Sequence, residues 1–162
     1  MAEIHVPENL ELGHQVGTLV GRTARVIDIA GRNKFDESCH VAYYVTREDE
    51  LAGFVVVDLD LAAYLGAALA MIPAGTAKED IEAGALSEDL LDAYYEVANI
   101  MAALLCADGA PHVRLIGIDD AGMPFEQRVL ATIQDPCRRL DFNLEVDDYG
   151  TGAMTILTAR MG

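Results

Sequence analysis

Three polar side chains interrupt a mostly apolar segment, DLLDAYYEVANIMAALL at residues 89–105, at spacings of four and three residues. They are Asp92, Glu96 and Asn99. In a helix with 3.6 residues per turn they share one stripe, which Ala103 continues one turn later. Carboxylates form ion pairs, and a carboxamide donates and accepts hydrogen bonds without adding charge. The stripe therefore has the chemistry to present a polar site to a partner.

The pattern alone leaves two interpretations of this stripe open. The stripe is either the solvated face of an ordinary surface helix or a presented functional site. A solvating face usually mixes basic residues with its acids, yet no Lys or Arg stands between Lys78 and Arg114. Asn99 is also a poor helix former in mid-helix, where Lys or Glu would serve solvation better. Both details favour a presented site.

Other catalytic or metal-binding patterns are weak. Residues 17–22 lack the lysine and the strand-to-helix setting of a phosphate loop, and there is no G-x-S-x-G sequence. Cys39 and His40 are interpreted as structural, and the four histidines lack metal-ligand spacing. We therefore expect no metal site in the protein itself. Three acidic pairs are interpreted as solvated loop charges: Asp58 and Asp60, Asp119 and Asp120, Asp147 and Asp148.

The composition limits the class of protein. With 162 residues, 52% of them hydrophobic, residues 1–162 are expected to form a single domain with a full core. The formal net charge of −16 argues against binding to nucleic acid and to anionic lipid. No secretory signal and no membrane-spanning run are recognised, which predicts a cytoplasmic protein. The three widely spaced cysteines suggest no disulfide framework, and Cys106 is expected to be a buried thiol.

The periodicity predicts an α+β fold, with a mostly antiparallel sheet of five to six strands packed against two long helices. No helix is found in residues 1–20, and residues 74–86 are interpreted as an acidic connector. Ser87 is the expected N-cap of the second helix. Hairpins are expected over 39–60 and at the end of the chain, the latter with its turn at 149–152. The candidate strands, from which the five to six of the sheet are expected, are 23–31, 39–48, 51–60, 112–119, the weakly patterned 124–134, 139–148 and 152–161. The expected helices are 59–72 and 88–107.

The spacing of Asp92, Glu96 and Asn99, followed by small residues, resembles the D/S-x3-E-x2-N signature of the CheC/CheX/FliY family. These proteins are phosphatases of the phosphorylated chemotaxis response regulator CheY. The setting is similar too, because a hairpin over 39–60 and an Ala-rich helix precede the motif helix, and a strand pair closes the chain. The resemblance covers roughly residues 39–162 and implies a CheX-like fold with a single motif helix.

The resemblance also implies a role for each residue of the stripe. Asn99 would orient the water that attacks the aspartyl phosphate, and Glu96 would form an ion pair with the active-site Lys of the response regulator. Asp92 would extend the contact at its rim, and Ala103, being small, would let the partner come close. The partner would supply the divalent metal ion, so the chain needs no cofactor of its own and no titrating catalytic base.

The chain departs from the family pattern at three places. Ala103 stands where the family often has Gly, no Pro falls at the expected place after the motif helix, and no opening helix is predicted. These differences leave open a non-catalytic CheX-like or FliM-like module that binds receiver domains. A third alternative is a small dimeric interaction domain or ligand sensor whose stripe is only solvated. The exposed edge strands of the predicted sheet allow a homodimer in every case.

Overall fold

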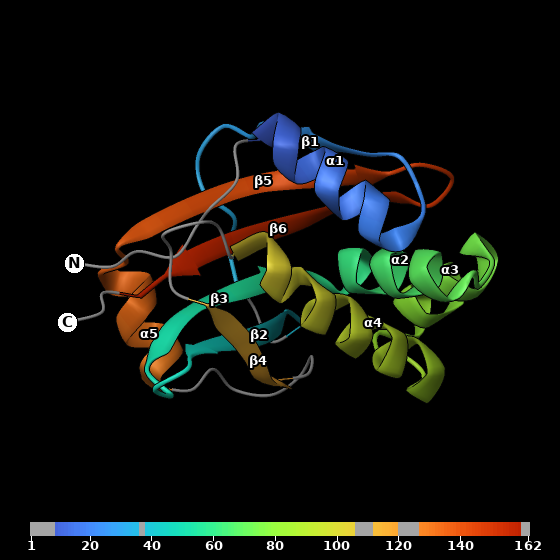
Figure 1. Cartoon of the computed structure of the whole chain (residues 1–162). Helices are drawn as coiled ribbons and strands as arrows, with labels where there is room; N and C mark the ends of the chain where they lie inside the picture. The colour runs from blue at the N-terminus through green and yellow to red at the C-terminus, as the bar shows by residue number, and fades with distance from the viewer. Residues whose placement is uncertain (1–8, 36–37, 106–111, 120–126, 160–162) are drawn as a thin grey trace.

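An antiparallel β-sheet lies at the centre of the part of the chain that the computed structural model describes, residues 9–35, 38–105, 112–119 and 127–159 (Figure 1). Its strands are β1 (Ala24–Ile27), β2 (His40–Thr46), β3 (Leu51–Val57), β4 (Val113–Asp119), β5 (Arg138–Val146) and β6 (Gly150–Thr158). Their order is β1-β5-β6-β3-β2-β4, and each of these pairings is antiparallel. The predicted α+β class with a mostly antiparallel sheet is confirmed.

Helices cover one face of this sheet and enclose the larger core. They are α1 (Asn9–Val20), α2 (Leu59–Ala70) and α4 (Glu88–Met101), with α3 (Ala74–Ala83) packed against α2 and the 3₁₀ turn η1 (Ala102–Leu105) continuing α4. Figure 1 shows α2, α3 and α4 grouped at one end of the molecule. Successive strand residues point to opposite faces, so Ala42 and Tyr44 of β2 lie in the core beneath these helices.

The opposite face of the sheet carries a second, smaller core. Val41 and Tyr43 of β2 point to this side, where Cys39 is also buried. Phe35, from the segment before β2, and Ile133, from α5 (Gln127–Gln134), pack against this cluster. The burial of Cys39 agrees with the structural role expected for it. Both faces of the sheet are therefore packed.

The helix α1 overturns the expectation that residues 1–20 contain no helix. Gly13 and Gly17 weaken the helical pattern, but both lie where α1 packs closely on the chain around β1. A Cβ at Gly17 would lie 2.4 Å from the carbonyl oxygen of Arg22, so the close approach requires glycine. An opening helix, one of the three features that the sequence seemed to lack, is thus present.

Two further helices replace other predicted elements. Helix α3 occupies most of the connector expected at 74–86, and Ala77 is its one buried residue, so its sequence has little apolar periodicity. The strand expected at 124–134 is wrong, because its described residues form α5. The β-branched residues of this segment suggest a strand, but in the helix Thr132 is buried and Ile133 packs on the smaller core.

Both predicted hairpins are present, with β2 paired to β3 and β5 paired to β6. The closing turn lies at 147–149 instead of 149–152, and Asp148 takes the left-handed conformation there, at φ 69°. Asp147 and Asp148 are exposed, as expected for solvated charges. Asp119 differs from that expectation, because it is half-buried and accepts a hydrogen bond from the Tyr43 hydroxyl. Asp120 lies outside the described residues.

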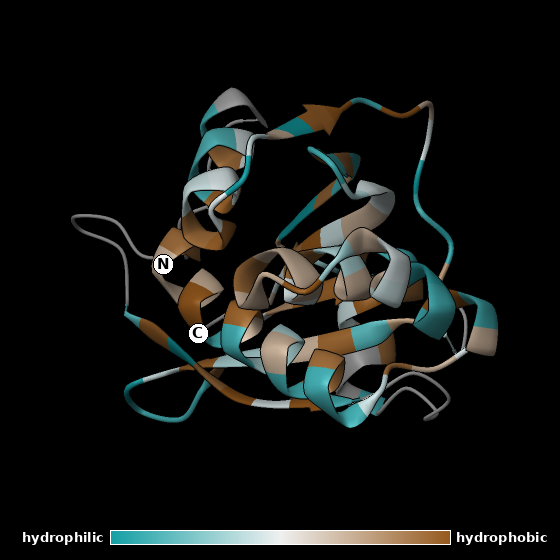
Figure 2. Cartoon of the chain, turned by 90° about the vertical axis from the view of Figure 1, so that its right-hand side faces the viewer, coloured by the Kyte–Doolittle hydropathy of each residue, from teal (hydrophilic) through white to brown (hydrophobic). Residues whose placement is uncertain are grey.

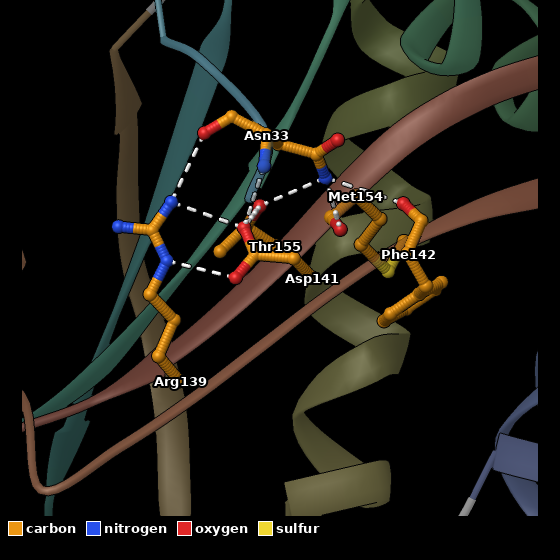
Figure 3. A network of polar contacts seen from close by, with 6 residues as sticks. All are labelled: Asn33, Arg139, Asp141, Phe142, Met154 and Thr155. Atoms are coloured by element: carbon orange, nitrogen blue, oxygen red, sulfur yellow. Dashed lines mark hydrogen bonds and ion pairs between the residues drawn. The ribbon is translucent and has the colours of Figure 1, made fainter. Parts of the chain in front are cut away.

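A buried polar network ties the segment before β2 to β5 and β6 (Figure 3). The guanidinium of Arg139 and the carboxylate of Asp141 form an ion pair at 2.8 Å, with side chains only 8% and 7% exposed. The side-chain amide of Asn33 donates to the carbonyl oxygen of Met154 at 2.9 Å and to the Thr155 hydroxyl at 3.0 Å. The network therefore fastens the segment around Asn33 to the sheet face opposite the helices.

The same network lowers the pKa of Asp141. Burial of the carboxyl group would raise its pKa, but hydrogen bonds from Arg139, from Thr155 and from the backbone N–H of Asn33 together outweigh burial. Asp141 therefore stays ionised in the folded protein. Because its pKa is lower in the folded than in the unfolded chain, the stability it contributes is present above about pH 4 and is lost as the pH falls through the folded-state pKa.

The substitution Asp141→Asn should lower the free energy of unfolding at pH 7 by about 3 kcal/mol, because it leaves the Arg139 charge buried without its partner. Urea unfolding followed by circular dichroism measures this change. The variant should also lose less stability than the wild type between pH 4 and more acidic conditions. As a control, Asp148→Asn removes an exposed ion pair with Arg22 and should cost less than about 1 kcal/mol. Equal losses for both variants would contradict the importance of the buried pair.

Candidate functional site

The stripe predicted on the motif helix is exposed. Asp92, Glu96 and Asn99 are solvent-exposed on α4, and Ala103 is exposed on η1. Among the described residues, the side chains of Asp92, Glu96 and Asn99 form no hydrogen bond or ion pair. Figure 2 faces the side of the molecule on which α2, α3 and α4 lie, and shows both hydrophilic and hydrophobic residues on this side. The predicted site residues thus share one accessible side of the motif helix.

The first turn of α4 begins where the sequence predicts. Ser87 is the N-cap residue, with extended backbone at φ −64° and ψ 163°, and Glu88 and Asp89 lie in the first turn. Acidic residues are favourable there because the N-terminal end of a helix carries partial positive charge. The Ser87 hydroxyl makes no capping hydrogen bond. Instead, the backbone N–H of Ser87 donates to the Asp80 carboxylate at 2.8 Å, which links α4 to α3.

The side of α4 opposite the stripe is packed, which fixes the direction of the stripe. Its buried residues are Leu90, Tyr94, Val97, Ala98 and Met101. Helix α2 approaches this surface at Gly66, where a Cβ would lie 3.0 Å from the carbonyl oxygen of Leu90 and 3.1 Å from the amide nitrogen of Tyr94. A side chain at this position would press on the backbone of α4. The absence of a side chain at Gly66 therefore sets the distance between the two helices.

The partner helix α2 is itself anchored by Asp58. The carboxylate of Asp58 caps α2 by accepting from the N–H of Leu61 at 2.8 Å, and it also accepts from the N–H of Ala153 at 3.1 Å. One side chain thus joins the start of α2 to strand β6. This arrangement corrects the interpretation of Asp58 as a solvated loop charge, while Asp60 lies half-buried in the first turn of α2.

The helical geometry changes immediately after Asn99. The backbone N–H of Ala102 donates to the carbonyl oxygen of Asn99, three residues back, and the 3₁₀ turn begins there. The α-helix expected over 88–107 therefore ends at Met101. Residues 106 and 107 of the expected range lie outside the described residues. The hydroxyl of Tyr44, from strand β2, donates to the carbonyl oxygen of Ala98 at 2.6 Å. Ala98, which accepts this buried hydrogen bond, immediately precedes Asn99 in the sequence.

Two tyrosines lie buried beneath this part of α4. Burial raises the pKa of Tyr44 well above its ordinary value of 10.0, and the neighbouring Tyr94 adds to the shift. Burial likewise raises the pKa of Tyr94, with a smaller contribution from the charge of Asp58. Both hydroxyls therefore stay protonated at neutral pH. The Tyr94 ring meets the His40 ring edge-on at 5.9 Å between centroids, and the Tyr94 hydroxyl has no hydrogen-bond partner within the described residues.

The structure adds one residue that the sequence analysis missed. Tyr95 is 47% exposed, which is unusual for a large aromatic side chain. It lies three residues after Asp92 and four before Asn99, so it occupies the same side of α4. Helical spacing alone places Tyr95 beside Asp92 and Asn99, but an aromatic residue in an apolar segment is more often expected to be buried in the core. With Tyr95 the stripe contains acidic, amide and aromatic groups, a mixture that suits binding better than solvation.

The described part of the chain contains no group of three or more acidic, His or Cys side chains positioned to hold a metal ion. Its exposed stripe is acidic, and Lys78 is the nearest basic residue before the motif in the sequence.

No described helix is long and apolar enough to cross a bilayer. Cys106, Pro111 and Pro124 lie outside the described residues. The site therefore offers groups that can be presented to a partner from a rigid helix, with Asn99 able to hold a water molecule.

Comparison with known proteins finds similarity at the level of structure. No family model and no curated protein sequence matches the chain. The FliM middle domain from H. pylori superimposes with a TM-score of 0.62 at 8% identity, covering 93% of this chain and 84% of that chain. FliY from Thermotoga maritima gives a TM-score of 0.54 at 15% identity, covering 91% and 82%. A chain of the CheX–CheY–BeF3–Mg2+ complex from Borrelia burgdorferi gives 0.50 at 12% identity, covering 94% and 99%.

Identities this low establish the fold and nothing finer. The similar structures include FliM domains as well as FliY and the CheX–CheY complex, so they do not by themselves distinguish a phosphatase from a non-catalytic module. They do agree with the observed α+β architecture. The chain has the CheC/CheX/FliY-type fold, as the resemblance of its motif implied.

Proposed function

We propose that this protein is a phosphatase of a phosphorylated CheY-type response regulator, acting through the exposed side of α4. The single observation that carries the proposal is that Glu96 and Asn99 lie exposed and unengaged on a helix whose opposite side is packed in the core. A side chain that serves the fold would normally have a partner or be replaced by a better helix former. The similarity to a CheX–CheY complex supports a CheY-type partner.

The proposed chemistry is hydrolysis of an aspartyl phosphate by an in-line water molecule. The response regulator supplies a divalent metal ion and a Lys, so the catalytic contribution of this chain is to orient the water. The neutral carboxamide of Asn99 can donate to and accept from that water without placing negative charge beside the phosphate. Glu96, one turn earlier, pairs with the Lys of the regulator, and Asp92 extends the contact. Ala103 leaves room for close approach.

A second candidate function is a receiver-binding module without catalysis. The FliM middle domain from H. pylori, which is structurally similar over nearly the whole chain, favours this candidate. The two functions differ in their dependence on Asn99. A binding module would recognise the phosphorylated regulator without accelerating loss of phosphate. In either case we propose a cytoplasmic protein, and a homodimer formed through an edge strand is compatible with both.

The substitution Asn99→Ala should lower the rate of phosphate release from the regulator by about a hundredfold or more, because it removes the group that orients the water. The measurement is the decay of a phosphorylated receiver domain with and without the protein. Gln134→Ala, an exposed change on α5 at the opposite face of the sheet, is the control and should keep the wild-type rate. If no receiver of the source organism loses phosphate faster with the wild type, the phosphatase proposal is wrong.

The substitution Glu96→Gln should weaken binding to the activated regulator about tenfold and reduce the dependence of binding on salt, because it removes one member of an ion pair but keeps the shape. Titration calorimetry against a receiver activated with beryllofluoride, at low and at physiological salt, measures both effects. Glu79→Gln on α3 removes an equal charge from an exposed position outside the stripe and serves as the control. Equal effects from the two variants would mean that only net charge matters.

Tyr95→Ala should raise the dissociation constant for the activated regulator about tenfold, since a half-exposed aromatic side chain beside Asn99 is well placed for an interface contact. The maximal rate at saturating regulator should stay near that of the wild type. Tyr95→Phe retains the ring and should bind nearly normally. An unchanged dissociation constant for Tyr95→Ala would place this side chain outside the interface.

A further inference from the structure

The hydrogen bond between the hydroxyl of Tyr44 and the carbonyl oxygen of Ala98 connects the centre of the sheet to the turn that carries Asn99. The two residues lie 54 positions apart in the sequence, and the donor–acceptor distance is 2.6 Å. We infer that Tyr44 is a positioning residue that holds Asn99 in its active orientation. This inference rests on the proposed phosphatase function, which it extends from the exposed stripe to the sheet beneath it.

The backbone hydrogen bonds of α4 change pattern next to this carbonyl group. In a regular α-helix the carbonyl oxygen of Ala98 would accept from the N–H of Ala102. Here the N–H of Ala102 donates to the carbonyl oxygens of Asn99 and Ile100. The Tyr44 hydroxyl donates to the Ala98 oxygen at the point where the α-helix becomes a 3₁₀ turn. A 3₁₀ turn is common at the C-terminal end of an α-helix, where carbonyl oxygens lose their regular intrahelical donors and accept hydrogen bonds from other groups.

Tyr44 is suited to give that support because its own position is fixed. It is fully buried and lies on β2, which is hydrogen-bonded to β3 on one side and to β4 on the other. Its raised pKa keeps the hydroxyl protonated, so it remains a donor at any physiological pH. The neighbouring Tyr94 hydroxyl makes no hydrogen bond within the described chain. Of these two buried hydroxyls, the one on Tyr44 is therefore the group that constrains α4.

The consequence for catalysis follows from the geometry of water positioning. A carboxamide can direct a water molecule only if its own plane and distance are held, and a displacement of about 1 Å can cost a hundredfold in rate. Asn99 is exposed, and its side chain has no partner among the described residues. Its orientation therefore depends on the backbone that carries it. The hydrogen bond from Tyr44 acts on the adjacent peptide group of that backbone.

The test is Tyr44→Phe, which removes the hydroxyl and leaves the ring that fills the core. We expect the maximal rate of phosphate release to fall about tenfold, with little change in the regulator concentration that gives half-maximal rate. The matched control is Tyr149→Phe, because the Tyr149 hydroxyl also donates to a main-chain oxygen, that of Ile72 after α2, at 2.7 Å. Tyr149→Phe should lose similar stability yet keep the wild-type rate.

A second control and a second readout make the result decisive. Tyr94→Phe removes a buried hydroxyl that belongs to α4 itself and should keep the wild-type rate. Hydrogen exchange measured by NMR should be about tenfold faster for the amides of residues 102–105 in Tyr44→Phe and unchanged in the other two variants. Unchanged exchange and rate in Tyr44→Phe would overturn the inference. If the wild type shows no phosphatase activity, the proposed function fails, whereas exchange at 102–105 still decides whether Tyr44 holds this turn.

Discussion

The close packing of α2 on α4 at Gly66 is the constraint on which the exposed stripe depends. Because this position has no side chain, the two helix backbones approach until a Cβ at Gly66 would lie only 3.0 Å from the carbonyl oxygen of Leu90. That approach buries Leu90 and Tyr94 and leaves the opposite side of α4, with Asn99, facing solvent. A larger residue at 66 would move α4 away from the sheet and lengthen the hydrogen bond from Tyr44. The absence of a side chain at Gly66 thus determines which side of α4 is exposed, and it also keeps α4 within reach of the Tyr44 hydroxyl.

The position of Tyr44 depends in turn on the register of the sheet. Alternate residues of β2 face opposite sides, so Tyr44 lies under α4 while Tyr43 lies in the smaller core. A slip of one residue would exchange the two, so the register decides that the hydroxyl beneath the motif helix is that of Tyr44. The smaller core and the buried pair of Arg139 and Asp141 hold the opposite face in place. Residues far from the stripe therefore contribute to its geometry through the sheet.

The sequence predicts the parts of this structure whose signal is local. Alternating apolar residues identify both hairpins, and helical spacing identifies the stripe of Asp92, Glu96 and Asn99 on an exposed side of α4. Prediction fails where tertiary contacts override local preference. Gly17 weakens the pattern of α1 because the packing of that helix requires a glycine, and the β-branched residues of α5 suggest a strand. The contact of Tyr44 with Ala98 joins residues 54 positions apart, so no periodicity could reveal it.

The distribution of charge along α4 is consistent with the chemistry proposed for it. The chain carries a net charge of −16, which repels a phosphorylated partner unless acidic groups face its cations and neutral groups face its phosphate. On α4 the acids end at Glu96, and the residues beyond it are uncharged as far as η1 extends. The carbonyl groups near a helix C-terminus are themselves partly negative. The carbonyl oxygen of Ala98 accepts a hydrogen bond from the Tyr44 hydroxyl, and that of Asn99 accepts one from the backbone N–H of Ala102. These hydrogen bonds partly neutralise the negative charge of the helix end where Asn99 would meet the phosphate.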